Sequence, residues 1–514
     1  GATRGIAMGN NARVGASGVD AIALGTNSVA TGSGRMAMGI GSNSSNTNTV
    51  SVGRFNTASG VGAVTMGNVN TASGATSTAM GTFSNAGAQF SLAIGNATTA
   101  ATGARVASGA TGGIAIGRNA AVAAAGLDAI ALGTNTQANA ANSTAIGASN
   151  VASGLVSVAI GGENNATANT STAVGYLNFA GGVNASTFGA DNDATGTNAT
   201  ALGSVNVATN NNASAIGFSN VANGLNSSAV GTQNTVEPDS GSAFGRENTV
   251  TANAPRGSAI GNYNRADASD STAVGLGNRA LGERSLALGS FSTSAAEQSL
   301  AIGTSSNLWP DGARVEAGAS RGIAIGNNAL VAADSADAIA LGTNTSVTSA
   351  NSVALGSGSV ASQANTLSVG DIGSERRIVN VAEGVDDTDA VNVAQLDAAI
   401  ASVDGGICAA GTGSDSLACG VGNDASGAFS AAVGYSNTAT GEQALAVGRD
   451  NTASASDSIT VGNYNTSTGT RGIAVGWSNS ATDANSTSVG YGNGAAAANS
   501  SAVGYANVAS GVES

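Results

Sequence analysis

The amino-acid sequence predicts an all-β solenoid built from 14-residue repeats, and three observations lead to this fold class. Glycines recur every 14 residues from Gly133 to Gly245. Many repeat glycines follow an apolar–small–apolar triplet, as Gly95 follows Leu92-Ala93-Ile94, and this alternation is typical of a strand with its large side chains on a buried face. A polar phrase such as Asn150-Val151-Ala152-Ser153-Gly154 then predicts a shorter strand between turns rich in Asn and Gly.

One coil of 14 residues is too short to bury a core, so the coils must stack. Stacking places each apolar residue over its equivalent in the next coil, and we expect the core to be a narrow apolar column. The high content of Gly, Ala, Ser, Thr and Asn would suit a disordered chain. The regular period argues against disorder, because a disordered chain needs no repeating apolar phrase.

The repeats divide the chain into three parts. Residues 1–373 form a first array of 25 coils, which at about 4.8 Å per coil makes a rod of roughly 120 Å. Residues 374–403 lack the repeat phrase, and residues 404–514 form a second array.

Two insertions interrupt the first array, at residues 96–113 and 304–322, and extra residues in a solenoid leave it as surface loops. The second insertion contains Trp309 in a conspicuous apolar phrase, Leu308-Trp309-Pro310-Asp311. This phrase is either a loop folded over its own coil or a ligand-binding loop on a rigid scaffold.

The segment between the arrays predicts a short helix. Its acidic cluster indicates a helix start, with Asp387 or Thr388 as the N-cap. Apolar residues then recur at spacings of 3, 4 and 3, which predicts a coiled-coil seam formed by Val393, Leu396, Ile400 and Val403. A helix this short is marginal in water alone, so it needs identical partners.

The two cysteines, Cys408 and Cys419, bracket the first coil of the second array. They form either a disulfide, which indicates an oxidising compartment, or a pair of free buried thiols. We expect no metal site, since the chain has no His and no further Cys.

Aromatic residues follow several repeat glycines of the second array. Trp477, Tyr491 and Tyr505 do so in consecutive coils, and strand spacing predicts that they form a short aromatic ladder. Such a ladder either stabilises stacked turns or offers a flat surface to a sugar or an extended peptide.

Charge and residue usage exclude several function classes. The formal net charge is −14 and every basic residue is Arg, which argues against binding nucleic acid or an anionic membrane surface. Without His or Lys the chain has no Ser–His pair, Schiff-base lysine or P-loop lysine. We expect neither an enzyme nor a cofactor.

Two motifs resemble the trimeric autotransporter adhesins of Gram-negative bacteria, the YadA-like family. Asn351-Ser352-Val353-Ala354-Leu355-Gly356 is similar to the head repeat of that family. Arg377-Ile378-Val379-Asn380-Val381-Ala382-Glu383-Gly384, followed by Thr388-Asp389-Ala390-Val391-Asn392-Val393-Ala394-Gln395-Leu396, resembles its neck.

This resemblance implies a left-handed parallel β-roll in a homotrimer, whose neck fastens the head to a coiled coil. It places Ile378, Val379, Asn380 and Val381 at the trimer interface together with the predicted seam. It implies a bacterial surface protein whose membrane anchor lies outside this fragment. It also implies adhesion to host matrix proteins such as collagen, fibronectin or laminin, to host cells and to sister cells. Asn351, Ser352 and Val353 are then candidate ligand-binding residues.

Two other functions compete with adhesion: a structural spacer, and a flat-faced solenoid that binds a glycan or ice. Thr144, Thr172 and Thr200 recur at one position, as in an ice-binding face, but other coils carry Ser, Leu or Ile there. That irregularity and the neck favour the adhesin.

Overall fold

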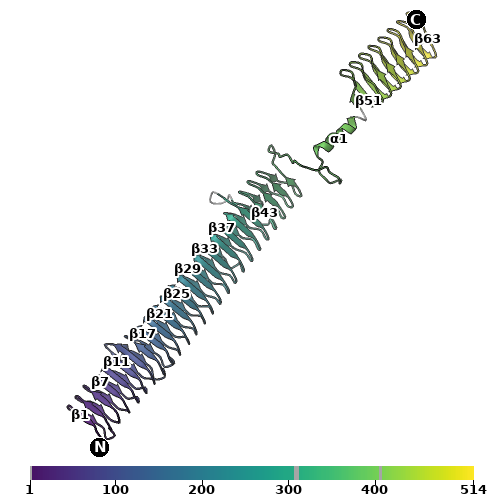
Figure 1. Ribbon diagram of the computed structural model, residues 1–514. Coiled ribbons are helices and arrows are strands. Elements are labelled where there is room, and N and C mark those ends of the chain that lie inside the picture. Colours follow the sequence, from purple (N-terminus) through teal and green to yellow (C-terminus); the bar gives the residue numbers. More distant parts are fainter. Residues whose placement is uncertain (1–2, 306–311, 405–407) are drawn as a thin grey trace. The chain divides into compact units, whose positions relative to one another are not determined.

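The computed structural model describes residues 3–305, 312–404 and 408–514, with the side chains of residues 403 and 404 excepted. The chain divides into two compact units, Gly1–Arg376 and Arg377–Ser514. Stacked coils make up the first unit and most of the second (Figure 1).

In the first unit each coil contributes one long and one short strand. The long strands form a parallel sheet of 25 strands, from β1 (Ile6–Met8) to β49 (Leu367–Ser368). The short strands form a second parallel ladder, from β2 (Arg13–Val14) to β48 (Val360–Ala361). Two strands per coil and a parallel solenoid are therefore confirmed.

The register repeats with the sequence period. The long strand β27 (Thr200–Ser204) lies between β25 (Ser186–Ala190) and β29 (Ser214–Phe218). Its central residue Ala201 pairs with Thr187 on one side and Ala215 on the other. Each residue thus stacks on its equivalent 14 positions away, as the repeat predicts.

The coil interior is narrower than the sequence pattern suggested. Ala201 of β27 and Ala208 of the short strand β28 (Val207–Ala208) are fully buried and face each other across the coil. Leu202 points to the opposite side of the sheet and is 43% exposed. The expectation that large apolar residues fill the core is therefore wrong. Long and short strands are joined by tight turns, so the largest fully buried side chains are Val and Asn.

The repeat glycine is required where it stands. Gly161 has φ +120°, and a Cβ there would lie 2.0 Å from the carbonyl oxygen of Gly175 in the next coil. A side chain at this position would separate the stacked coils.

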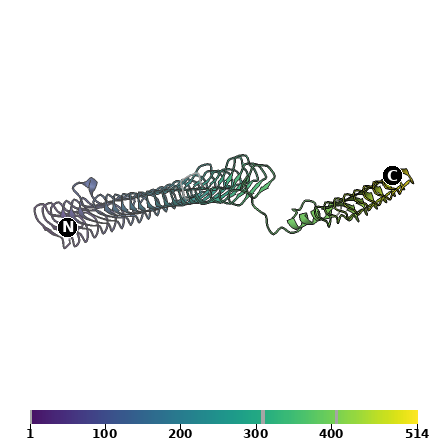
Figure 2. The same ribbon diagram turned by 90° about the horizontal axis from the view of Figure 1, so that it is seen from above.

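The first insertion leaves the stack as a short 3-10 turn, η1 (Ala100–Thr102), between β13 (Leu92–Asn96) and β14 (Arg105–Val106). Seen from above, it projects from the coils (Figure 2). The ladder continues past it, because β13 pairs with β15 (Ile114–Ile116).

The second unit begins with an irregular segment and the helix α1 (Val393–Asp404). The expected N-cap was wrong: the helix starts five residues after Thr388, and its N-cap is Asn392. Asn392 Oδ1 accepts the Gln395 N–H at 3.0 Å, and Gln395 Oε1 accepts the Asn392 N–H at 3.4 Å, which is a capping box. Within the described residues, no helix has the length and apolar character needed to span a membrane.

The second array opens with an antiparallel pair, β50 (Cys408–Ala410) and β51 (Leu417–Val421). From β51 onward the strands are parallel, and the long-strand sheet of eight strands ends at β62 (Ser501–Tyr505). The short strands form a sheet of six, from β53 (Thr438–Ala439) to β63 (Val508–Ala509).

Candidate functional site

The outer face of the long-strand sheet carries an apolar stripe along the first unit. Its members precede the repeat glycines, point away from the coil interior and are each 36% to 45% exposed. We define the stripe as Met66, Leu132, Phe188, Leu202, Phe244, Ile260, Leu288, Leu341 and Leu355. A row of exposed large apolar side chains on one face is typical of an interaction surface.

The neck carries a second exposed apolar surface. Ile378 is 66% exposed and Val379 is 60% exposed, while Asn380 is exposed with φ 62° and Val381 is half-buried. On α1 the predicted seam residues Val393, Leu396 and Ile400 are 72%, 52% and 50% exposed. The side chain of Val403 lies outside the described residues. Among the described residues, one chain thus gives the neck and helix no apolar core.

Polar side chains hold the neck segment in shape. Gln395 Nε2 donates to the Gly384 carbonyl and its Oε1 accepts the Gly384 N–H, both at 2.9 Å. Asn392 Nδ2 donates to the Val381 carbonyl at 3.3 Å. Our sequence reasoning missed this role for Gln395 and Asn392. The signal was an Asn followed three residues later by Gln, at the start of an apolar seam.

Asp389 closes a turn ahead of the helix. Its Oδ2 accepts the N–H groups of Val385 at 2.9 Å and Asp386 at 3.1 Å. These hydrogen bonds, the one from Val385 first, lower the pKa of the Asp389 carboxyl from its ordinary value.

The predicted aromatic ladder is present in part: the three residues are in register, but only two of the three rings stack on each other. Strand pairing brings Trp477, Tyr491 and Tyr505 into register. The Tyr491 and Tyr505 rings stack with centroids 5.2 Å apart, whereas Trp477 meets the edge of Tyr464 at 5.5 Å. Arg449 continues the row, because its guanidinium carbon lies 5.9 Å from the Tyr464 ring centre. The aromatic side chains of this row are 43% to 74% exposed.

The remaining predicted residues lie apart from this row. Asn351 is exposed in a turn with φ 54°, and Val353 is half-buried. Ser352 is fully buried and its Oγ donates to the Ser349 carbonyl, so its side chain lies inside the coil. Trp309 lies outside the described residues.

Cys408 and Cys419 face each other across the antiparallel pair and form a disulfide. The bridge joins β50 to the first long strand of the second array.

Comparison with protein-family models gives two matches. The model of the YadA head domain repeat matches residues 16–42, 72–98, 124–150, 152–178, 180–206, 194–220, 208–234, 222–248, 252–278, 280–306, 333–359, 348–371, 439–465 and 467–493. The model of the coiled stalk of trimeric autotransporter adhesins matches residues 377–418. Comparison with curated protein sequences gave no significant match.

Among solved structures, the chain is similar to the crystal structure of the collagen-binding domain of the Yersinia adhesin YadA. The identity is 21% over 52% of this chain and 85% of that chain, with a TM-score of 0.14. The head-repeat matches together span more than half of the chain, and the stalk match covers the neck and α1. The chain therefore belongs to the family of trimeric autotransporter adhesins.

Proposed function

We propose that this chain is a surface-exposed part of a homotrimeric adhesin on the outer membrane of a Gram-negative bacterium. It attaches the cell to host matrix proteins of the collagen, fibronectin or laminin class or to host cells, and it mediates association with sister cells. Each coil array winds as a left-handed β-roll. The disulfide agrees with an oxidising, extracytoplasmic location.

Trimer assembly is supported by the surfaces that one chain leaves uncovered. The apolar stripe exposes large apolar side chains in register with the repeat, and the neck and α1 expose Ile378, Val379, Val393, Leu396 and Ile400. The partner that suits both surfaces is another copy of the same chain, because identical coils place identical stripes at identical spacing. Burying the exposed part of one leucine of the stripe contributes about 1 kcal/mol to the free energy of association. The other residues of the stripe add similar contributions along the unit.

Adhesion is supported by the family and by the repeated surface that a trimer would present. Many weak, equivalent sites on three rods bind strongly through avidity without a deep pocket. In this proposal the row around Trp477, Tyr491 and Tyr505 and the exposed Asn351 and Val353 are ligand-contacting residues.

The first experiment measures the mass of this chain in solution by light scattering at neutral pH. We expect three times the chain mass of 48.5 kDa. Binding to immobilised collagen, fibronectin and laminin follows, with residues 96–113 and 304–322 deleted in turn. A monomer would contradict the assembly, and a trimer that binds none of the three proteins would leave the structural-spacer function favoured instead.

The alternative of a flat-surface glycan binder depends on the aromatic row alone. It predicts that a soluble glycan competes for the second array and that Trp477→Ala abolishes this binding. Deleting either insertion in the first array would then have no effect on binding.

A further inference from the structure

The first third of this acidic chain has an unusual charge distribution. Between Asp20 and Asp128 the sequence has no Asp or Glu, but it has four arginines. One of them, Arg105, lies in the first insertion, and Arg118 follows it. An arginine that forms no ion pair with the protein can attract an external anion.

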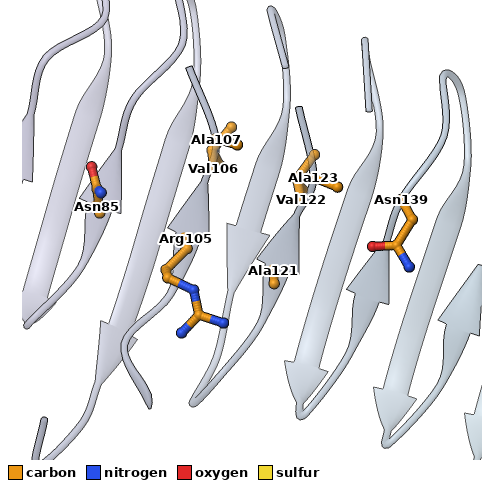
Figure 3. A pocket seen from close by; sticks show the side chains of 8 residues that line it. All are labelled: Asn85, Arg105, Val106, Ala107, Ala121, Val122, Ala123 and Asn139. Carbon is orange, nitrogen blue, oxygen red and sulfur yellow. The ribbon is translucent and has the colours of Figure 1, made fainter. Parts of the chain in front are cut away.

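A depression of about 320 Å³ lies beside Arg105 on the outer face of the short-strand ladder. Small side chains line its floor: Ala107, Ala121 and Ala123 occupy positions where other coils carry larger residues. Arg105 lies between Asn85 and Asn139 at the two ends, with its guanidinium on the side of Ala121 (Figure 3).

Arg105 is positioned by neutral groups. Its Nη1 donates to the Ala101 carbonyl of η1, and its Nη2 donates to Asn119 Oδ1 at 3.2 Å. Within the described part of the chain it has no ion pair. The insertion therefore orients the guanidinium while its charge stays uncompensated.

The second insertion repeats this geometry with the charge compensated. Arg314 is the equivalent of Arg105, and its Nε lies 3.2 Å from Glu316 Oε1. Glu316 occupies the position of Ala107, and Leu330 occupies the position of Ala121. At the second insertion, Glu316 supplies a carboxylate and Leu330 fills the space that is open beside Arg105.

The same carboxylate also binds a backbone amide. Glu316 Oε2 accepts the Ala333 N–H at 3.1 Å, and in a third coil Glu237 Oε2 accepts the equivalent N–H of Ala252 at 3.1 Å. In the first insertion the equivalent amide is that of Ala124, which donates to no other group among the described residues. At the first insertion the backbone amide that a glutamate binds in two other coils has no such acceptor, and the neighbouring Arg105 has no ion pair within the described residues.

We propose that the depression formed by Arg105, Ala107, Ala121 and the Ala124 amide binds the carboxylate of an acidic side chain from a partner polypeptide. Glu316 shows the proposed arrangement: its carboxylate forms an ion pair with Arg314 and accepts a backbone N–H from Ala333. The hydrogen bond from Ala333 is charge-assisted, and such bonds are stronger than neutral ones. The site deepens the proposed adhesin function, since it names a partner chemistry for the first array.

The test measures binding of fluorescently labelled poly-L-glutamate to the whole chain, with poly-L-glutamine as the neutral probe. Ala107→Glu places an internal carboxylate in the site, as Glu316 does in its own coil, so the fold tolerates it. We expect Ala107→Glu and Arg105→Gln each to weaken poly-L-glutamate binding by about fivefold per site, the range of one partly exposed ion pair. Raised salt should weaken wild-type binding further.

Equivalent positions in other coils provide matched control variants. Arg314→Gln should leave binding unchanged, because Glu316 already occupies that site. The double variant Glu316→Ala and Leu330→Ala should gain binding, because it recreates the open depression. Glu237→Ala should not gain it, since Thr235 stands there in place of an arginine.

Unchanged binding by Ala107→Glu would overturn the proposal, as would hyaluronan, a carboxylate-bearing glycan, binding more tightly than poly-L-glutamate. The carboxylate site lies within one chain, so this proposal can fail while the chain still forms trimers and binds matrix proteins. The light-scattering and matrix assays report those two properties separately.

Discussion

At the scale of single residues, the two columns that hold the coils together are Gly and Asn. Many coils carry a buried asparagine three residues after the repeat glycine, and its side-chain amide links neighbouring coils. Asn206 Nδ2 donates to the Gly217 carbonyl at 2.8 Å, and its Oδ1 accepts the Asn220 N–H at 3.1 Å. Each amide thus satisfies backbone groups in the next coil that water does not reach.

Substituting Asn206 by Ala should destabilise its coil by about 1–3 kcal/mol, because a buried carbonyl and a buried N–H lose their partner. The amide of Asn220 should then exchange its hydrogen roughly tenfold faster or more. Asn206→Ser is the matched control, since Ser84 fills this position naturally and bonds the Met80 carbonyl at 2.8 Å. Equal protection in the Ala variant and the wild type would contradict the role of the ladder.

Some turns carry residues that suit them poorly. Val205 has φ 58°, a left-handed conformation that a β-branched residue seldom adopts, and its side chain is 41% exposed. Val205→Asn should raise the stability of this turn by about 1 kcal/mol, because Asn adopts this conformation more readily. The midpoint of thermal unfolding should rise. Val207→Asn, two residues on in a strand, should lower that midpoint.

At the scale of elements, the neck is a turn and a capped helix without a core of its own. Asp389 closes the turn as a carboxylate, and its pKa is lowered from the ordinary 3.8. A lowered pKa in the folded state means that the ionised form is stabilising. That contribution is present above the ordinary pKa and is lost as the pH falls through the lowered value.

The amide proton shifts of Val385 and Asp386 should therefore titrate together, with a midpoint below 3.8. In Asp389→Asn the oxygen acceptor remains but the charge is gone, so this titration should disappear. A titration midpoint at or above the ordinary aspartate pKa of 3.8 would show that the turn does not depend on the Asp389 carboxylate.

At the scale of the whole molecule, the apolar stripe should decide assembly. Leu202→Glu combined with Leu341→Glu places charges in the stripe, and burying an unpaired charge is unfavourable. We expect light scattering to report a lower mass for this variant than for the wild type. Val207→Glu carries the same change on the short-strand face and should leave the mass unchanged. If Val207→Glu lowered the mass and the stripe variant did not, the interface would lie on the short-strand face, and the assignment to the long-strand sheet would be wrong.

The sequence by itself determined the period, the two strands of each coil, the two arrays and the helical segment between them. These depend on local patterns: glycine recurrence, alternation and turn residues. The family came from the resemblance of two motifs, the head repeat and the neck, to known adhesins.

Tertiary structure alone decided which face of each strand points inward. Alternation with period two places Ala201 and Leu202 on opposite faces, but it assigns neither to the core. The narrow coil admits Ala201 and turns Leu202 outward, which converts an expected core into an apolar stripe. Likewise Thr388 resembled an N-cap in sequence, but the bonds from Gln395 to Gly384 fix the helix start at Asn392. The open carboxylate site depends on stacking, because only the coil register brings Arg105 beside Ala121.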